Sequence, residues 1–199
     1  MSKLIDPFVA FFGLIVLSPL FIVIALLIKL QDGGPIFYRA VRIGLQGKLF
    51  ELIKFRTMVV DAERIGAGIT NAGDKRITPF GKRLRQFKLD EIPQLINIVK
   101  GELKFVGPRP EDPRYTSLYT EEQKKILYVY PGITSPASLY YKNEASQLTG
   151  KNWEEKYIKK IMPEKIAIDL KYFKSNTILS DCIIIFKTII SIFHFDVTT

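Results

Sequence analysis

Two adjacent carboxylates, Asp90 and Glu91, begin a stretch with helical periodicity over residues 89–100. Free backbone N–H groups and the positive end of the dipole at a helix start keep a carboxylate ionised and also attract phosphate. Pro93 fits the first turn, because amides there have no intrahelical acceptor to lose. The pair therefore predicts one of two things: a phosphate-directed catalytic site with an anionic nucleophile, or an N-cap followed by a first-turn charge.

Basic residues stand close to this pair in the sequence, including Arg83, Arg85 and Lys88. Because a carboxylate and a diphosphate repel each other, a divalent cation held by adjacent carboxylates would help to neutralise the site. We therefore expect Asp90 and Glu91 to be metal ligands, with Mg²⁺ as the cofactor.

A second candidate is Arg109, which lies between Pro108 and Pro110. Two flanking prolines restrict the loop, so little conformational entropy is lost when the guanidinium is aimed at a phosphate or a base.

The elements that must position these residues indicate an α+β, mainly helical domain over residues 31–199. Strands at 36–38 and 48–55 around a turn at 44–47 are typical of a small β-hairpin. Gly101 is a natural stop for the helix at 89–100. Further helices are expected at 59–64, 79–87, 121–128 and 153–173, and a glycine-rich loop at 66–74.

The C-terminal segment predicts an amphipathic helix with an apolar stripe and an opposite polar face. Such a helix either lies in a membrane interface or closes the core of the domain, and the sequence leaves both open. Ile184 interrupts the polar face, which contains Asp181, Lys187, Thr188 and Ser191. The stripe contains Leu179, Cys182, Ile183, Phe186, Ile189, Ile190 and Phe193.

The N-terminal segment has no charge over residues 8–28, which is long enough for a helix to cover a hydrocarbon core of roughly 30 Å. Ser18 and Pro19 lie at its centre, where proline kinks a helix and the Ser18 hydroxyl can bond a carbonyl within one turn. We expect residues 1–30 to form a re-entrant membrane helix with Lys3 and Lys29 at one face. A kinked span is the alternative; the long apolar run disfavours a signal peptide.

Composition favours a lipid surface. The formal net charge is +9, 47% of the residues are hydrophobic and the mean hydropathy is +0.11. A basic, apolar chain suits anionic headgroups and phosphorylated substrates. No nucleic-acid motif accompanies the basic residues, so no nucleic-acid partner is expected. The alternative function is a basic, membrane-tethered binding protein without catalysis.

The sequence around the carboxylates resembles the bacterial sugar transferase family. The resemblance rests on Lys88-Leu89-Asp90-Glu91-Ile92-Pro93-Gln94-Leu95-Ile96-Asn97-Ile98-Val99-Lys100-Gly101 and on Phe105-Val106-Gly107-Pro108-Arg109-Pro110. Further matches are Ser18-Pro19, Lys54-Phe55-Arg56-Thr57-Met58, Asp74 with Arg76-Ile77-Thr78, and Pro131-Gly132-Ile133-Thr134. They follow the family's order over nearly the whole chain.

The resemblance implies a monotopic phosphoglycosyl transferase of the small single-domain type, with its catalytic domain on the cytoplasmic face of the bacterial inner membrane. The residue at Asp90 would attack the diphosphate of a UDP-sugar, release UMP and hold the sugar phosphate until polyprenol phosphate, such as undecaprenyl phosphate, accepts it. This step begins the assembly of a glycoconjugate. Glu91 would support the nucleophile and magnesium. The resemblance places substrate-binding residues at Lys54, Arg56, Arg85, Pro108, Arg109, Pro110 and Lys142.

Overall fold

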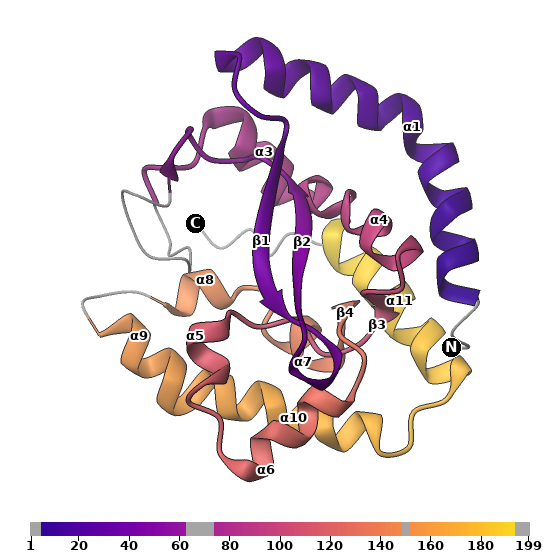
Figure 1. Ribbon diagram of the computed structural model, residues 1–199, viewed down its shortest axis with the longest axis vertical. Helices are drawn as coiled ribbons and strands as arrows, with labels where there is room; N and C mark the ends of the chain where they lie inside the picture. The colour runs from indigo at the N-terminus through magenta and orange to yellow at the C-terminus, as the bar shows by residue number, and fades with distance from the viewer. Residues whose placement is uncertain (1–4, 63–73, 149–151, 194–199) are drawn as a thin grey trace.

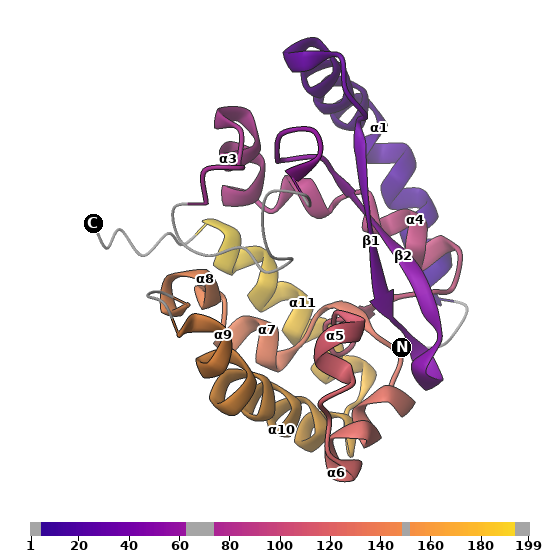
Figure 2. The same cartoon turned by 60° about the vertical axis from the view of Figure 1, so that its left-hand side comes forward.

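The computed structural model describes residues 5–62, 74–148 and 152–193. The helix expected at 59–64 lies partly, and the glycine-rich loop at 66–74 almost entirely, outside these residues. The described chain is mainly helical with two small sheets, as expected (Figure 1). Figures 1 and 2 show α1 on one side of the molecule and α9 and α10 on the opposite side.

Helix α1 (Ile5–Asp32) is long and apolar enough to cross a membrane, judged by length and composition. It contains Pro19, and the Ser18 hydroxyl donates to the Ile15 carbonyl at 2.8 Å, as the sequence predicted. Figure 1 shows that α1 bends along its length.

Both halves of α1 pack against the rest of the chain. Ala10 in the first half is fully buried beside Leu95 and Ile98. Ile24 in the second half is buried beside Phe55. Between them, Leu14, Leu17 and Phe21 pack against the same two clusters, while Val16 on the outward face is 76% exposed. The bent helix therefore contacts the domain along its inner face and leaves its outer face uncovered.

The expected hairpin is confirmed. Strand β1 (Phe37–Ile43) pairs antiparallel with β2 (Leu49–Phe55) across the 3-10 turn η1 (Leu45–Gly47). Strand β1 is longer than the predicted 36–38, because its register pairs every residue from Phe37 to Ile43 with the partner strand.

The stretch predicted as one helix over 89–100 is instead broken. Helix α3 (Pro79–Gln86) is followed by a 3-10 turn, η2 (Leu89–Glu91), and α4 begins only at Gln94 and ends at Val99. Pro93 has no N–H to donate into a continuous helix, so it stands just before α4. Gly101 has φ +76° and ends the segment, as expected.

A two-stranded parallel sheet follows, made of β3 (Lys104–Val106) and β4 (Gly132–Thr134). Gly132 is required there, since a Cβ would lie 2.2 Å from the Gly107 nitrogen. Short helices connect the two strands and lead onward: α5 (Pro113–Thr116), α6 (Glu121–Lys124), η3 (Lys125–Tyr128), α7 (Pro136–Tyr140) and α8 (Glu144–Gln147).

The helical stretch predicted over 153–173 contains α9 (Trp153–Lys156), a π-helical turn η4 (Tyr157–Ile161) and α10 (Met162–Phe173). Pro163 explains the turn, because proline cannot donate the regular helical hydrogen bond. This half of the domain has its own core, formed by Tyr115, Tyr119, Ile126, Tyr141, Leu148, Tyr157, Ile161, Met162 and Ile166.

Helix α11 (Ile178–Phe193) turns its polar side toward the domain. Asp181 is buried, and the Thr188 hydroxyl lies 2.7 Å from the Thr134 hydroxyl. Ile184, the apolar residue on that side, is also buried. The apolar stripe faces outward, so of the two alternatives left open by the sequence, closure of the core by this stripe is excluded. Its exposed members include Leu179, Ile183, Phe186, Ile189 and Ile190.

Candidate active site

Asp90 and Glu91 lie in η2, between α3 and α4. Lys88, just before this turn, adopts a left-handed conformation with φ 55°. Non-glycine residues rarely occupy this region, and such strain is concentrated at functional sites. The chain thus makes a sharp bend immediately before the two carboxylates.

The amides around the pair are not the free donors of a long helix. Glu91 N–H donates to the Lys88 carbonyl at 3.2 Å, and Ile92 N–H donates to the Leu89 carbonyl at 3.3 Å. The expectation that Asp90 and Glu91 open a helix is therefore wrong. Positive charge at the site comes from side chains instead.

Glu91 is held by two cations. Lys54 Nζ donates to its Oε1 at 3.0 Å, and Arg109 donates to both of its carboxylate oxygens. Although burial opposes ionisation, the charges of Arg109 and Lys54 hold the pKa of Glu91 well below its ordinary value. Glu91 is consequently a fixed anion that joins β2 to the loop after β3.

Asp90 has the opposite environment. It is only 7% exposed, and its Oδ1 is buried without a hydrogen-bond partner. Burial and the negative charge of Glu91 raise the pKa of Asp90, while the charges of Lys54, Arg85 and Lys88 oppose that shift. A buried carboxylate with one unbonded oxygen and cations nearby can act chemically as a nucleophile.

Arg85 reaches the site because α3 lies unusually close to the end of β2. Its Nε donates to the Thr57 hydroxyl at 2.8 Å. A Cβ on Gly81 would lie 2.1 Å from the Thr57 carbonyl, so only glycine allows this approach. Thr78 caps α3 by accepting from Gly81 N–H at 2.9 Å.

Arg109 is positioned by the parallel sheet. Gly132 N–H donates to the Pro108 carbonyl at 2.9 Å, which fixes the loop immediately before Arg109. Pro108 and Pro110 are buried on either side of it. Charge–charge attraction to Glu91 raises the pKa of Arg109, so it is permanently charged.

The structure brings Lys54, Arg85 and Arg109 to the carboxylate pair but directs Arg56 elsewhere. The Arg56 guanidinium pairs with Asp32 at the end of α1, and its Nε donates to the Pro35 carbonyl at 2.6 Å. Arg56 thereby fastens α1 to β2. Lys142 is exposed between α7 and α8, two residues before Glu144, whose charge acts on Arg109.

Three polar residues were not singled out from the sequence. Thr57 orients Arg85, as described above. Asn97 is fully buried and connects α4 to β2: it accepts from Ile53 N–H at 3.0 Å and donates to the Glu51 carbonyl at 2.7 Å. Gln94 is 1% exposed, and its Nε2 has no hydrogen-bond partner. The sequence signal that could have pointed to Gln94 was its spacing of four residues from Asp90.

Magnesium suits this donor set in part. Among the described residues, no group of three or more His, Cys, Asp or Glu side chains could hold a metal ion. Mg²⁺ commonly uses one or two carboxylates together with substrate phosphates. The orphaned Oδ1 of Asp90 fits that role, whereas both Glu91 oxygens already accept from Arg109.

The chain is similar in sequence to known proteins. A sequence model described as bacterial sugar transferase matches residues 1–195. The exopolysaccharide production protein ExoY of Sinorhizobium fredii is 34% identical over 199 residues, covering 92% of this chain and 81% of that protein.

Two longer relatives have names that state an activity. The UDP-N-acetylgalactosamine-undecaprenyl-phosphate N-acetylgalactosaminephosphotransferase of Aeromonas hydrophila is 33% identical, covering 92% of this chain and 41% of that protein. The UDP-glucose:undecaprenyl-phosphate glucose-1-phosphate transferase of Klebsiella pneumoniae is also 33% identical, covering 94% of this chain and 39% of that protein. With the family match extending over nearly its whole length, the chain belongs to the bacterial sugar transferase family.

Proposed function

We propose that this protein transfers a sugar 1-phosphate from a UDP-sugar to polyprenol phosphate, with undecaprenyl phosphate as the acceptor, and thereby begins glycoconjugate assembly. The observation that carries the proposal is the buried, unbonded Oδ1 of Asp90 beside a neighbouring anion that is fixed by two cations. The relatives named for undecaprenyl-phosphate transfer support the acceptor.

In the first step, an Asp90 carboxylate oxygen attacks the phosphorus that carries the sugar. The bond from that phosphorus to the bridging oxygen breaks, UMP leaves, and the sugar phosphate becomes attached to Asp90. In the second step, an oxygen of polyprenol phosphate attacks the same phosphorus and frees the carboxylate. Dividing the transfer lets a water-soluble donor depart before a membrane-bound acceptor enters.

The surrounding residues have different electrostatic roles. Arg85 and Lys54 act on Asp90 and would face the anionic oxygens of the incoming diphosphate. Glu91, held by Arg109, keeps a fixed negative charge beside Asp90. This charge partly offsets the nearby cations, so they hold the Asp90 carboxylate less tightly. The side-chain Nε2 of Gln94, which has no partner, offers one further hydrogen-bond donor and does not give up a proton in doing so.

We further propose that Mg²⁺ binds at Asp90 and Glu91 together with the two substrate phosphates. When bound, the ion would neutralise charge that develops on the diphosphate. Chelation with EDTA is expected to abolish turnover, and Mg²⁺ to restore it. Full activity after exhaustive chelation would show that the basic side chains neutralise the site alone.

We propose that the protein is attached to the cytoplasmic face of the bacterial inner membrane, and its exposed apolar surfaces support attachment to a membrane. The outward side of α1 exposes Phe8, Val16 and Leu30, and the outward stripe of α11 exposes Leu179 and Phe186. Exposed apolar areas of this kind mark membrane or protein contacts. We propose that α1 is re-entrant and that α11 lies in the interface.

The covalent step is tested with radiolabelled UDP-sugar in the absence of polyprenol phosphate. Label is expected on Asp90, located by mass spectrometry of the quenched protein, and released on adding the acceptor. Asp90→Asn should take up none, while Arg114→Ala, at an exposed ion pair with Asp112, should label normally. Turnover without any trapped label, or label on Glu91, would favour direct attack by the acceptor.

A further inference from the structure

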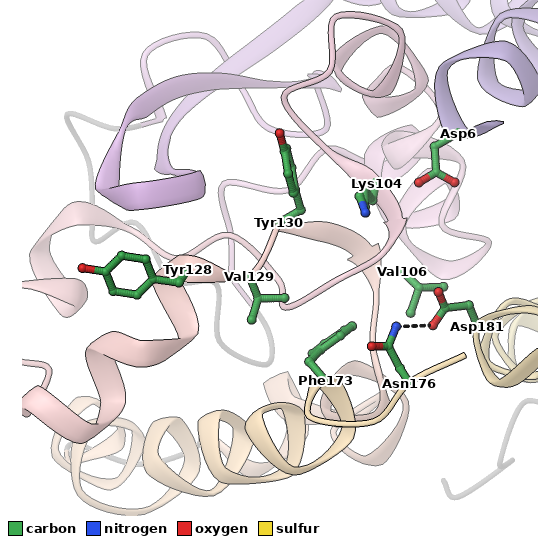
Figure 3. Close-up of a pocket in the computed structure, with 9 residues that line it drawn as sticks. All are labelled: Asp6, Lys104, Val106, Tyr128, Val129, Tyr130, Phe173, Asn176 and Asp181. Carbon is green, nitrogen blue, oxygen red and sulfur yellow. Dashed lines mark hydrogen bonds between the residues drawn. The ribbon is translucent and has the colours of Figure 1, made fainter. Parts of the chain in front are cut away.

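A second polar cavity lies beside the start of α1, and Asp90, Glu91, Lys54, Arg85 and Arg109 do not line it. It has a volume of 270 Å³ and is formed by β3, the segment before β4, the α10–α11 connection and the first turns of α1 and α11 (Figure 3). The lining residues used below are Asp6, Lys104, Tyr130, Phe173, Asn176 and Asp181.

Asp6 is the unexplained group in this cavity. It is 2% exposed, and neither carboxylate oxygen has a hydrogen-bond partner. Figure 3 shows its carboxylate directed into the space that Lys104 and Asp181 also border. A buried carboxylate without a partner is costly unless something binds it. The positive charge of Lys104 acts on Asp6, but among the described residues no donor bonds either oxygen, so the cavity lacks a hydrogen-bond donor at Asp6.

The neighbouring carboxylate is already satisfied. Asp181 is equally buried, and it accepts from the Tyr172 hydroxyl at 2.9 Å and from Asn176 Nδ2 at 3.1 Å. These bonds fix Asp181 as a negative wall of the cavity. Asp6 and Asp181 together favour a positively charged ligand.

An ammonium group suits the cavity better than a metal ion. Two carboxylates line it among the residues that the structure describes, and Lys104 would repel a divalent cation. Aromatic rings of Tyr130 and Phe173 line the remaining wall, and ring faces attract ammonium groups. Lys104 Nζ already lies 5.1 Å from the centre of the Tyr130 ring.

Lys104 adds the opposite requirement. It places a positive charge in the same cavity as the two carboxylates, so the complementary ligand carries an anion as well as an ammonium. The volume lies just below the roughly 300 Å³ at which pockets for drug-sized ligands begin. A small zwitterion fits these limits, whereas a nucleotide does not.

The surroundings indicate where such a zwitterion comes from. Next to Asp6, Ile5 is 43% and Phe8 65% exposed, and close to Asp181, Leu179 is 72% exposed. These apolar side chains belong to the surfaces proposed above to contact the membrane. A ligand with a polar head in the cavity and an apolar tail along α1 or α11 would use both features.

We propose that this cavity binds the phosphoethanolamine headgroup of a membrane lipid, with its ammonium at Asp6 and its phosphate at Lys104. The inference rests on the proposed membrane attachment but not on the proposed chemistry at Asp90. It assigns the start of α1 a specific lipid contact in addition to non-specific burial of its apolar side.

The headgroup site is tested first with soluble compounds on the detergent-purified full chain. Phosphoethanolamine is expected to raise the melting temperature of the wild type and of Glu122→Gln, an exposed control on α6. Asp6→Asn should bind phosphoethanolamine about tenfold more weakly or worse, since one charge-assisted hydrogen bond is lost. Phosphocholine, which has no ammonium hydrogens, should bind weakly to every variant.

A second variant protects the test if Asp6→Asn fails to fold. Lys104→Gln should keep the response to ethanolamine but lose the extra stabilisation that phosphoethanolamine gives over ethanolamine. Equal responses of wild type and both variants to phosphoethanolamine would overturn the proposal. So would stabilisation by Mg²⁺ or Ca²⁺ that depends on Asp6 while phosphoethanolamine has no effect, because the cavity would then be a metal site.

The lipid source is tested by incubating each protein with equal amounts of phosphatidylethanolamine and phosphatidylcholine that share the same acyl chains. Lipid retained after purification is quantified by mass spectrometry. Enrichment of phosphatidylethanolamine in the wild type, lost in Asp6→Asn, supports the proposal. Equal retention of both lipids overturns the lipid source, even where soluble phosphoethanolamine binds. Failure of every variant to bind either lipid or vesicles would instead refute the membrane attachment.

Discussion

Arg109 donates to both carboxylate oxygens of Glu91, so the loop after β3 and the η2 turn are joined at the centre of the site. Lys54 donates to the same carboxylate from β2. Three segments that are far apart in the sequence thus meet at one anion. Asp90, the adjacent residue, is left with a buried oxygen that accepts no hydrogen bond.

Replacing Arg109 should uncouple this arrangement. Arg109→Ala leaves Glu91 with Lys54 alone, and we expect turnover to fall about 10²- to 10³-fold, the usual effect of losing one electrostatic contact at a reacting centre. Arg109→Lys should recover little, because an ammonium cannot reproduce the two-oxygen contact. Steady-state turnover checks this, with Arg114→Ala as the matched control. Wild-type turnover in Arg109→Ala would refute a role for the contact.

The acid side of the pH profile should report Asp90. Burial and Glu91 raise the pKa of Asp90, and only the ionised carboxylate can attack phosphorus. Activity is therefore expected to decline, as pH falls, at a higher pH than an ordinary aspartate would give. Arg85→Met removes a charge that favours ionisation, so its decline should begin at still higher pH, with roughly 10²-fold lower activity at neutral pH. Arg85→Lys should restore the profile in part. Identical profiles for the wild type and Arg85→Met would contradict this account.

Sequence periodicity identified the residues of η2 and α4 but not their conformation. Residues 89–100 carry apolar side chains at helical spacing, and over so short a stretch a 3-10 turn followed by a short helix gives nearly the same pattern. The left-handed Lys88 has no sequence signal at all, since lysine is unremarkable in a regular helix. The candidate site residues could be named from the sequence, although the strained turn that positions them could not.

Contacts between side chains that are distant in the sequence could not be predicted either. Arg56 lies two residues after Lys54, so a continuous strand would turn both side chains to the same face. Strand β2 ends at Phe55, however, and Arg56 beyond it pairs with Asp32 while Lys54 donates to Glu91. The orientation of α11 was ambiguous for a similar reason. Amphipathicity identifies a polar and an apolar face of the helix. Which of these faces packs against the domain depends on Thr134 and other residues outside the helix.

A buried carboxylate away from the active site gives a prediction for stability. Asp169 accepts from Ala137 N–H at 3.0 Å, and burial raises its pKa from 3.8 to about 6. Between these two values the folded state keeps a proton that the unfolded state has lost, so stability falls as pH rises and the loss is complete above about pH 6. The loss amounts to about 3 kcal/mol at about 1.4 kcal/mol per unit of pKa.

Asp169→Asn keeps an acceptor for Ala137 N–H without the buried charge. Thermal unfolding at pH 8 should show the variant to be more stable than the wild type, and the difference should shrink below pH 5. Asp112→Asn provides a control of opposite sign: although burial opposes it, hydrogen bonding to Arg114 lowers the pKa of Asp112, so that variant should be less stable at neutral pH. Parallel pH profiles for Asp169→Asn and the wild type would refute the assignment.

The bend in α1 gives the last prediction, which concerns topology. Ala10 and Ile24 lie in opposite halves of α1, and both are buried against the same domain, while Val16 on the outward face is 76% exposed. A helix that bends within the membrane and returns to the same side would keep both of its halves against one domain in this way. Cysteines introduced at position 2 and at Lys29 should therefore react with a membrane-impermeant reagent only from the cytoplasmic side. Pro19→Ala restores an amide donor and removes a steric clash, so it should straighten the helix and favour a span. In that variant, labelling at position 2 is expected to shift toward the periplasmic side, whereas Gly13→Ala, whose added Cβ would lie 3.7 Å from Leu95 in ordinary contact, should keep the wild-type pattern. Periplasmic labelling of position 2 in the wild type would rule out the re-entrant arrangement.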